Sequence, residues 1–517
     1  MNKFKILLLL LLVTPIVNSQ VPNIVWRKYY GGNSGEATSI LKTSDGGYVI
    51  AGIAENSHSE AVDFHGSRDG FIVKLNSLYE LEWSKCYGTQ GLDEIKEIKQ
   101  TSDGGYIFTG HTSLPYQPGS TLTDFWIVKI DSLGNVIWEK RYGGTNEDYA
   151  KSVCEISTGG YLVTGSSRSA DGHVGSSFGY DDYWVLKLDI NGNIIFSKIY
   201  GGPRNDYGMS SVVNQDGSYV VLGEAFSYTG QVICRNPSTC ESDFWVVKCN
   251  NSGNIIWTKC FGPNYSGSNY FSTPHKIIKT TDGGYVLIGR GNSGDNPQGA
   301  TDFWVIKIDS NGNLQWKNSY GGTEHDKALS IKQTVDGGYI VVGSSYSSDG
   351  QVTVNLGQYS VENGWIIKIN NNGVLQWQKT VGSSFFGYDH LSDVVEVGTN
   401  EFIAVGKSGN SNDDCFESNG RGFWVTKLAT GTLNSENFQF TDFEIYPNPT
   451  ENLLKFRSNS NEIVSKVIIH DISGRKVFEL NSENITEVDI TTLTKGVYTI
   501  TISNKNYSNS RKIIKKQ

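Results

Sequence analysis

Some residue types and patterns are scarce in this chain of 517 residues, and each scarcity excludes a class of protein. Only 19% of the residues are charged, and the net charge of −9 comes without a dense cluster of Lys and Arg. This balance argues against a protein that binds the nucleic-acid backbone, which carries clustered basic residues. After the first twenty residues no apolar run approaches the ~18 residues that cross a bilayer, so we expect no integral membrane protein.

The usual signatures of catalysis and metal binding are also missing. The eight His include no H-E-x-x-H motif, and the seven Cys show no paired C-x-x-C spacing of the kind that binds zinc. The stretch Gly175–Gly179 matches G-x-S-x-G, but that motif works in a strand-to-helix turn and here lies in a β-rich repeat. His325, between Glu324 and Asp326, is interpreted as a surface residue. We therefore predict no catalytic residue, no cofactor and no metal site, although Asp413 and Asp414 leave a Ca²⁺ site open as an extra.

The first residues have the pattern of an export signal. Lys3 and Lys5 precede the apolar run 6–13, and small residues follow up to Ser19. This pattern predicts a secretory signal peptide over residues 1–19, cleaved between Ser19 and Gln20. The alternative is an N-terminal membrane anchor, but the run is too short to span a bilayer.

The cysteines of an exported protein can form disulfides. Cys234 and Cys240 enclose one short loop, and the other five cysteines are scattered along the chain. We therefore predict a disulfide between Cys234 and Cys240.

A repeat of 55 to 61 residues dominates residues 20–433. It reads N-x-x-W-x-K-x-Y-G-G, then D-G-G-Y, then V-x-x-G, then D-F-W-V-x-K-x-D-x-x-G, and it occurs in seven copies. All twelve Trp occupy two repeat positions. The first position holds Trp26, Trp83, Trp138, Phe196, Trp257, Trp316 and Trp377. The second holds Phe71, Trp126, Trp184, Trp245, Trp304, Trp365 and Trp424. Repetition at this period indicates a propeller or a solenoid.

Each repeat contains four strand-like segments, and Asn-Gly or Ser-Gly pairs mark hairpins within it. Four antiparallel strands in seven copies predict an all-β fold, a seven-bladed β-propeller over residues 20–433. A linear solenoid is the alternative, but neither end of the array carries a polar capping repeat. The array begins at the Trp strand 23–28 and ends at 423–428 without another Trp strand. The N-terminal strand should therefore complete the last blade and close the ring.

The repeat resembles those of β-propellers in secreted bacterial surface proteins. The shared motifs are Y-G-G, D-G-G-Y and F-W-V-x-K-x-D-x-x-G-N, over about residues 22 to 430. The last copy departs most, since Gly398-Thr-Asn-Glu-Phe402 replaces D-G-G-Y.

The C-terminal part, residues 442–517, shares neither the repeat nor its acidity and follows a polar linker, 434–441. It has eleven basic and nine acidic residues, and its alternating apolar runs predict a small β-sandwich. The motifs Tyr446-Pro-Asn-Pro449, Asp471–Arg475 and Gly496-Val-Tyr498 resemble the C-terminal sorting domain (type A) of the type IX secretion system of Bacteroidetes. That resemblance implies export by the type IX machinery to the outer-membrane surface or the medium. An accessory β-sandwich is the alternative.

Function is expected where the repeats differ, in the long loops between the second and third strands. Those loops and the neighbouring inter-blade loops should share one face, and they carry aromatic residues among Ser, Gly and Asn. The residues are Phe64, Tyr116, Phe178, Tyr180, Tyr228, Tyr265, Phe271, Tyr346, Tyr359, Phe385, Phe386 and Tyr388. Such residues can form a surface that recognises a glycan or a protein, or they can pack on their own blades.

Two function classes remain open. The first is a secreted, non-catalytic binding or adhesion module, and the second is a hydrolase or lyase that acts on surface glycans. A cluster of carboxylates or of several Arg at the mouth of the central channel would favour the enzyme. An apolar mouth would favour the binding module.

Overall fold

The computed structural model describes the strands and most of the connections between them. The described residues are 21–31, 35–55, 61, 63–113, 122–234, 242–262, 272–291, 301–356, 361–382, 388–409, 422–430, 443–458, 464–471, 475–482, 484–503 and 508–516. Over these ranges the chain forms strands and turns but no helix, and so no helix that could cross a membrane. The chain divides into two compact units, Met1–Thr430 and Gly431–Gln517. The predicted signal peptide and its cleavage site, Ser19 and Gln20, lie outside the described residues, as does the predicted linker.

Four-stranded antiparallel sheets make up the described part of the first unit, and the chain builds six of them in sequence order. The first contains β2 (Gly35–Lys42), β3 (Tyr48–Ala54), β4 (Asp69–Leu75) and β5 (Leu81–Tyr87). The second contains β6 (Asp93–Gln100), β7 (Tyr106–Ser113), β8 (Thr123–Ile130) and β9 (Val136–Tyr142). The third contains β10 (Asp148–Glu155), β11 (Tyr161–Ser167), β12 (Asp182–Leu188) and β13 (Ile194–Tyr200).

The next three sheets follow the same plan. The fourth contains β14 (Asp206–Val213), β15 (Tyr219–Ala225), β16 (Asp243–Cys249) and β17 (Ile255–Phe261). The fifth contains β18 (Ser272–Lys279), β19 (Tyr285–Gly291), β20 (Asp302–Ile308) and β21 (Leu314–Tyr320). The sixth contains β22 (Asp326–Gln333), β23 (Tyr339–Ser345), β24 (Asn363–Ile369) and β25 (Leu375–Val381).

The seventh sheet of this unit joins the two ends of the repeat region. It contains β26 (His390–Gly398), β27 (Glu401–Ser408), β28 (Gly422–Ala429) and, beside β28, β1 (Asn23–Tyr30). The pairing of β1 with β28 is antiparallel and runs from Asn23 opposite Ala429 to Tyr30 opposite Phe423. The prediction that the N-terminal strand completes the last sheet is therefore confirmed.

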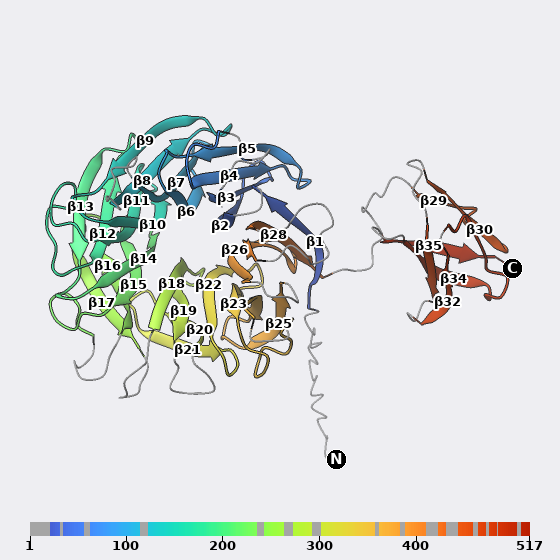
Figure 1. The fold of residues 1–517 in the computed structure, drawn as a ribbon. Coiled ribbons are helices and arrows are strands. Elements are labelled where there is room, and N and C mark those ends of the chain that lie inside the picture. Colours follow the sequence, from blue (N-terminus) through green and yellow to red (C-terminus); the bar gives the residue numbers. More distant parts are fainter. Residues whose placement is uncertain are drawn as a thin grey trace, which may run out of the picture. The chain divides into compact units, whose positions relative to one another are not determined.

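The sheets follow one another around a ring, as expected for a propeller-like fold (Figure 1). The first strand of each sheet contacts the first strand of the next, so β2, β6, β10, β14, β18, β22 and β26 lie innermost. The Trp strands lie at the outer edge of each sheet.

Repeated aromatic residues connect neighbouring sheets. In four sheets the ring before the third-strand Trp packs on the Trp of the following sheet, as Phe125 does on Trp184 with the ring centroids 4.2 Å apart. The same contact joins Phe303 to Trp365 at 4.6 Å. These six third-strand tryptophans are among the most deeply buried large side chains in the described chain. Their repetition in the sequence thus has a packing cause, because close-packed aromatic pairs stabilise the contact between sheets.

The repeated lysines of the third strands are also structural. Four of them are almost completely buried and form ion pairs with the Asp of the D-G-G turn in the same sheet, and the other three, Lys187, Lys248 and Lys427, are half-buried. These pairs are Lys74–Asp45 (2.9 Å), Lys129–Asp103 (2.8 Å), Lys307–Asp282 (2.9 Å) and Lys368–Asp336 (2.8 Å).

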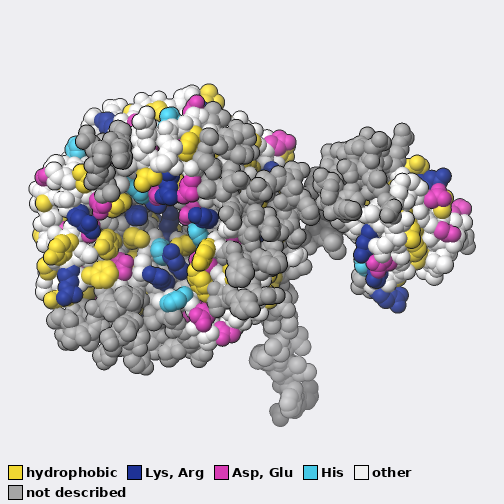
Figure 2. All heavy atoms as spheres, in the orientation of Figure 1, with side chains coloured by type: hydrophobic (Ala, Val, Ile, Leu, Met, Phe, Trp, Pro, Cys, Tyr) yellow, Lys and Arg dark blue, Asp and Glu magenta, His cyan; other side chains and the backbone are white. Residues whose placement is uncertain are grey.

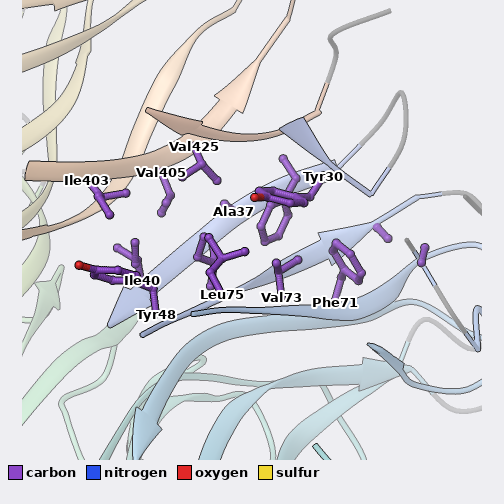
Figure 3. Close-up of a cluster of buried hydrophobic side chains, with 14 of the residues drawn as sticks. Tyr30, Ala37, Ile40, Tyr48, Phe71, Val73, Leu75, Ile403, Val405 and Val425 are labelled. Atoms are coloured by element: carbon purple, nitrogen blue, oxygen red, sulfur yellow. The ribbon is translucent and has the colours of Figure 1, made fainter. Parts of the chain in front are cut away.

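The last and the first sheets share one apolar core (Figure 3). Ile403, Val405 and Val425 of the last sheet are buried in it together with residues of β2, β3 and β4. Phe423 packs edge-on against Phe71, which occupies the third-strand Trp position of the first sheet, at 5.3 Å. Ring closure therefore uses the same kind of aromatic contact as the junctions made by Phe125 and Phe303.

The second unit contains two smaller sheets. One has the order β29 (Phe443–Tyr446), β30 (Leu453–Ser458) and β33 (Glu487–Asp489). The other has the order β32 (Lys476–Asn481), β31 (Lys466–His470), β34 (Gly496–Ser503) and β35 (Ser508–Lys515). A single apolar core includes Leu454 and Val488 from the first of these sheets and Val467 and Ile500 from the second.

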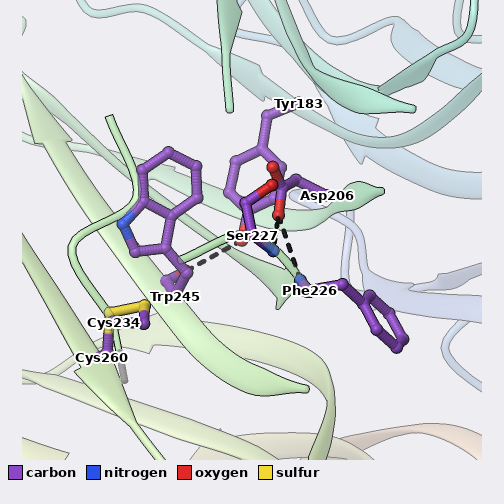
Figure 4. Close-up of a disulfide and its surroundings, with 7 residues drawn as sticks. All are labelled: Tyr183, Asp206, Phe226, Ser227, Cys234, Trp245 and Cys260. Carbon is purple, nitrogen blue, oxygen red and sulfur yellow. Dashed lines mark hydrogen bonds between the residues drawn. A yellow bond between two sulfur atoms is a disulfide. The ribbon is translucent and has the colours of Figure 1, made fainter. Parts of the chain in front are cut away.

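The disulfide prediction is wrong in its second partner. Cys234, in the connection between β15 and β16, is bonded to Cys260 on β17, with the Cα atoms 5.4 Å apart (Figure 4). Cys260 is far in sequence, but the outermost strand β17 brings it beside the start of this loop. Loop length alone suggested Cys240, which lies outside the described residues.

Candidate functional site

One face of the ring, here called the loop face, collects the connections between sheets and the connections between second and third strands. Backbone contacts hold the two kinds together: Asp93 N donates to Arg68 O at 2.9 Å, and Thr301 forms a bridge with His325. Each innermost strand starts at this face and runs away from it. Residues early in an innermost strand therefore lie near the loop-face end of the central channel.

The predicted aromatic residues of the loop face fall into three groups. Phe178, Tyr180 and Tyr388 are exposed, with 51%, 72% and 70% of their surface accessible. Phe64, Tyr228 and Tyr346 are half-buried and packed on the fold. The remaining six, Tyr116, Tyr265, Phe271, Tyr359, Phe385 and Phe386, lie outside the described residues.

The packed group has local partners. Phe64 packs on the core beneath the first sheet, and the guanidinium of Arg204 lies 4.9 Å from the ring centroid of Tyr228. Tyr346 donates its hydroxyl proton to Glu362 at 3.1 Å, and burial raises the pKa of Tyr346 to about 12. Both interpretations of the loop aromatics, exposed recognition groups and packing groups, therefore apply, each to different residues.

The other residues singled out from the sequence have structural surroundings. The Gly175–Gly179 stretch lies in a strand-to-strand connection, where the N–H groups of Phe178 and Gly179 donate to Asp182. His325 is exposed, and its Nδ1 lies 2.9 Å from Thr301 Oγ1. Asp413 and Asp414 lie outside the described residues. Within the described ranges, no group of three or more His, Cys, Asp or Glu is placed to hold a metal ion.

Two carboxylates near the mouth of the channel, Glu36 and Glu94, are paired with basic groups. His390 Nε2 lies 3.1 Å from Glu36 Oε1, and Lys96 Nζ lies 2.5 Å from Glu94, which also contacts Arg68. Burial opposes ionisation of Glu94, but the charges of Lys96 and His111 outweigh it and lower the pKa to about 2. These carboxylates are therefore ionised at neutral pH and have no proton to donate. The sequence analysis considered two compositions of the mouth: a cluster of carboxylates or Arg for an enzyme, and an apolar mouth for a binding module. The structure has neither of them.

Deeper in the channel, five charged residues form what we call the plug: Glu97, Lys99, Lys276, Lys332 and Asp393. Lys276 on β18 reaches Glu97 on β6 at 2.5 Å, although two sheets separate these strands around the ring. Lys99 lies 2.9 Å from the same Glu97 oxygen, and Lys332 lies 3.5 Å from Asp393. Glu97 is 2% exposed, and the positive charges of Lys276 and Lys99 overcome its burial and lower its pKa. The ion pair therefore spans the channel at this level.

Pairs of buried carboxylates recur where neighbouring sheets meet on the loop face. Asp302 begins β20 and Asp326 begins β22 of the next sheet, and they are 7% and 0% exposed. A Cβ added to Gly321 would lie 2.4 Å from an oxygen of each, so the glycine of Y-G-G fits between them. The Oδ1 atom of Asp302 is buried, and no group of the described residues donates a hydrogen bond to it.

Burial raises the pKa of Asp302 to about 7, with a further contribution from the charge of Asp326. At this degree of burial no substrate reaches either carboxylate, so the pair is structural. Asn363 occupies the position of Asp302 in the next sheet, where its Nδ2 donates to Asn355 at 2.9 Å.

The raised pKa of Asp302 predicts a pH effect on stability. The pKa of the Asp302 carboxyl is higher in the folded protein than in the unfolded chain, so its protonation stabilises the fold at low pH. This contribution to the free energy of unfolding is lost as the pH rises from about 4 to about 7. We expect Asp302→Asn, which copies Asn363, to gain about 2–3 kcal/mol of unfolding free energy relative to the native protein between pH 5 and pH 8. Urea unfolding at the two pH values measures this difference.

Asp309→Asn is the control, because Asp309 is only half-buried, in the turn before β21, and hydrogen bonds from Asn313 lower its pKa. It should shift stability equally at both pH values. An Asp302→Asn curve parallel to that of the native protein would contradict the assignment.

The second unit matches a known family. Residues 444–516 match the secretion system C-terminal sorting domain. This sorting domain marks proteins that the type IX machinery handles, and the protein is secreted or displayed at the cell surface. The resemblance inferred from the motifs of residues 442–517 is confirmed.

The repeat region has more distant relatives. The regulatory protein FlaEY of Caulobacter vibrioides is 26% identical over 403 residues, covering 67% of this chain and 40% of that protein. This chain therefore spans less than half the length of that relative.

Among solved structures, the extracellular domain of a proposed hybrid two-component system from B. thetaiotaomicron aligns at 11% identity with a TM-score of 0.42. The alignment covers 96% of this chain and 59% of that one. Sqt1 from Chaetomium thermophilum aligns at 10% identity with a TM-score of 0.38 and coverages of 76% and 86%.

Proposed function

We propose that the protein is a non-catalytic binding or adhesion module, a seven-bladed β-propeller with a C-terminal β-sandwich that the type IX system delivers to the cell surface or the medium. The observation that carries the proposal is the group of exposed aromatic side chains on the loop face, Phe178, Tyr180 and Tyr388. Exposed aromatic residues among small polar ones provide rigid, amphipathic contact area for a glycan or protein ligand.

The alternative is a hydrolase or lyase acting on surface glycans. General acid catalysis needs an accessible carboxyl group that keeps its proton near neutral pH. The carboxyl groups with raised pKa at the sheet junctions are buried, and Glu36 and Glu94 at the channel mouth have lowered pKa values because basic groups contact them. Half-buried Glu224 on β15 also has a raised pKa, through burial, but Thr273 Oγ1 donates to it at 3.4 Å and the charge of Arg290 opposes the rise. The binding function is therefore the better supported of the two.

A glycan array probed with the purified full-length secreted protein tests the proposal. We expect binding to at least one glycan class, lost in the double variant Phe178→Ser, Tyr180→Ser. Val335→Ser is the control, because Val335 is 92% exposed in a D-G-G turn at the far ends of the innermost strands. Cleavage of the bound glycan would support the enzyme instead, and equal binding by all variants would contradict a loop-face site.

A further inference from the structure

Four basic residues gather at the loop-face end of the channel, above the plug; together they are here called the basic basin. Lys151 lies on β10, His275 on β18, Arg290 on β19 and Lys327 on β22, so three different sheets contribute. Lys151 and His275 each occupy the bulged position of an innermost strand, and Lys327 is the second residue of its own. Figure 2 shows Lys and Arg side chains collected in the hollow at the middle of the ring.

The basin residues repel one another. The pKa of His275 falls well below its usual value through burial and then through the charges of Lys327, Arg290 and Lys151. Burial and the charge of Lys96 lower the pKa of Lys151 to about 8. These effects place Lys151, Arg290 and Lys327 within electrostatic reach of His275.

The basin lacks the compensation that the plug has. Within the described chain, neither Lys151 nor Lys327 forms an ion pair, whereas Lys99, Lys276 and Lys332 all do. The buried Nε2 of His275 and Nε of Arg290 also have no hydrogen-bond partner among the described residues. Buried polar atoms without partners are costly, and an anion that accepts their hydrogen bonds would remove that cost.

The charge distribution of the molecule strengthens this site. Most of the negative charge of the chain lies in the repeat region, yet Lys151, Arg290 and Lys327 gather around His275 at the loop-face end of its channel. A recessed site in which basic groups have no ion-pair partner attracts anionic ligands, although Glu224 beside Arg290 offsets part of this charge. The basin is therefore a preorganised anion site.

The rim of the basin contains groups suited to a sugar. Tyr149, Tyr207 and Thr273 are the second residues of β10, β14 and β18, and all three are half-buried. Tyr rings offer an apolar face with a hydroxyl at the edge, and the Thr hydroxyl both donates and accepts hydrogen bonds. A polyhydroxylated ring fits these groups better than a peptide side chain does.

We propose that the basic basin binds an acidic saccharide, with a sugar carboxylate on Lys151, Lys327 and Arg290 and the sugar ring against Tyr149 and Tyr207. This proposal rests on the binding function above and assigns a site and a ligand class to it. Charge-assisted hydrogen bonds to a carboxylate supply the affinity, because the basic groups are already held together without a partner.

Calorimetric titration of the full-length secreted protein with trigalacturonate tests this site. We expect binding that weakens as NaCl rises, and no measurable binding of the neutral maltotriose. Lys151→Met and Lys327→Met should each weaken binding of trigalacturonate at least about tenfold, as for the loss of one hydrogen bond to a charged group. Lys279→Met is the matched control, since Lys279 lies exposed at the other end of β18, and it should bind as the native protein does.

Other outcomes overturn the proposal. Equal binding of triglutamate or of sulfate alone would show a site that recognises charge and no sugar. Absence of trigalacturonate binding, or binding that both lysine variants and NaCl leave unchanged, would remove the basin as the site. If the glycan array detects binding that the lysine variants retain, the basin proposal fails and the binding function stands. If neither the array nor the titration detects binding, both proposals fail. The salt dependence uses the native protein and so does not depend on the folding of a variant.

Discussion

Removal of residues 20–32 should prevent the repeat region from forming a stable closed ring. The deletion takes away β1 and leaves β28 with an unpaired edge in the last sheet. It also removes the ring contact of Trp26 with Tyr79 at 5.3 Å and the hydrogen bond from Lys28 Nζ to Tyr79 O at 2.7 Å. These contacts bind the last sheet to the first, so their loss affects the junction as well as one sheet.

We expect the free energy of unfolding to fall by more than about 5 kcal/mol, which is comparable to the whole stability of many domains. Thermal unfolding and light scattering would show this as early melting and aggregation through the exposed edge. A synthetic peptide of residues 21–31 supplied in excess should restore part of the stability. Trp26→Ala is a milder control that keeps the backbone pairing of β1. Unchanged melting of the deleted protein would show that β28 needs no partner.

Truncation after Leu433 should abolish export and leave the repeat region folded. The two units have separate apolar cores, and the match to the sorting domain starts at residue 444. In a host with a type IX system, we expect the truncated protein to accumulate in the periplasm. Fractionation followed by immunodetection of the repeat region measures its location.

Two controls separate export from folding. The retained protein should keep the Cys234–Cys260 disulfide and the melting temperature of the full chain. Residues 434–517 fused to an unrelated periplasmic protein should carry that protein to the surface. Efficient appearance of the truncated chain in the medium would contradict the role of the sorting domain.

The sequence predicted the sheets well because the residues that form the strands and pack the sheets together recur from repeat to repeat. The Trp, Tyr-Gly-Gly and Asp-Phe-Trp positions recur because most sheets make the same contacts with the next one, as Phe125 does with Trp184. The array begins with a Trp strand and ends without one, and this predicted β1 as the partner of β28. Cys260 was missed as a disulfide partner because the distance between two cysteines in the fold depends on strand order, and the prediction used loop length alone.

The basic basin was missed for a different reason. Lys151, His275 and Lys327 lie at positions of the innermost strands where the repeats differ, and no single repeat contains the site. Comparing these positions across the repeats, as was done for the loops, would have shown Glu36, Glu94, Tyr149, Tyr207, Thr273, Lys327 and His390 at equivalent places. Their convergence follows only from ring closure.

The ion pair between Lys276 and Glu97 spans the channel below the basic basin and is an obstacle to passage through it. A polymer strand cannot be threaded through an obstructed passage, so a chain that enters from the loop face must leave by the same opening. Only a chain terminus or a short side branch can reach the bottom of the hollow. Attachment through this site would then depend on how many ends a surface polymer presents, and lengthening each chain would not add binding sites.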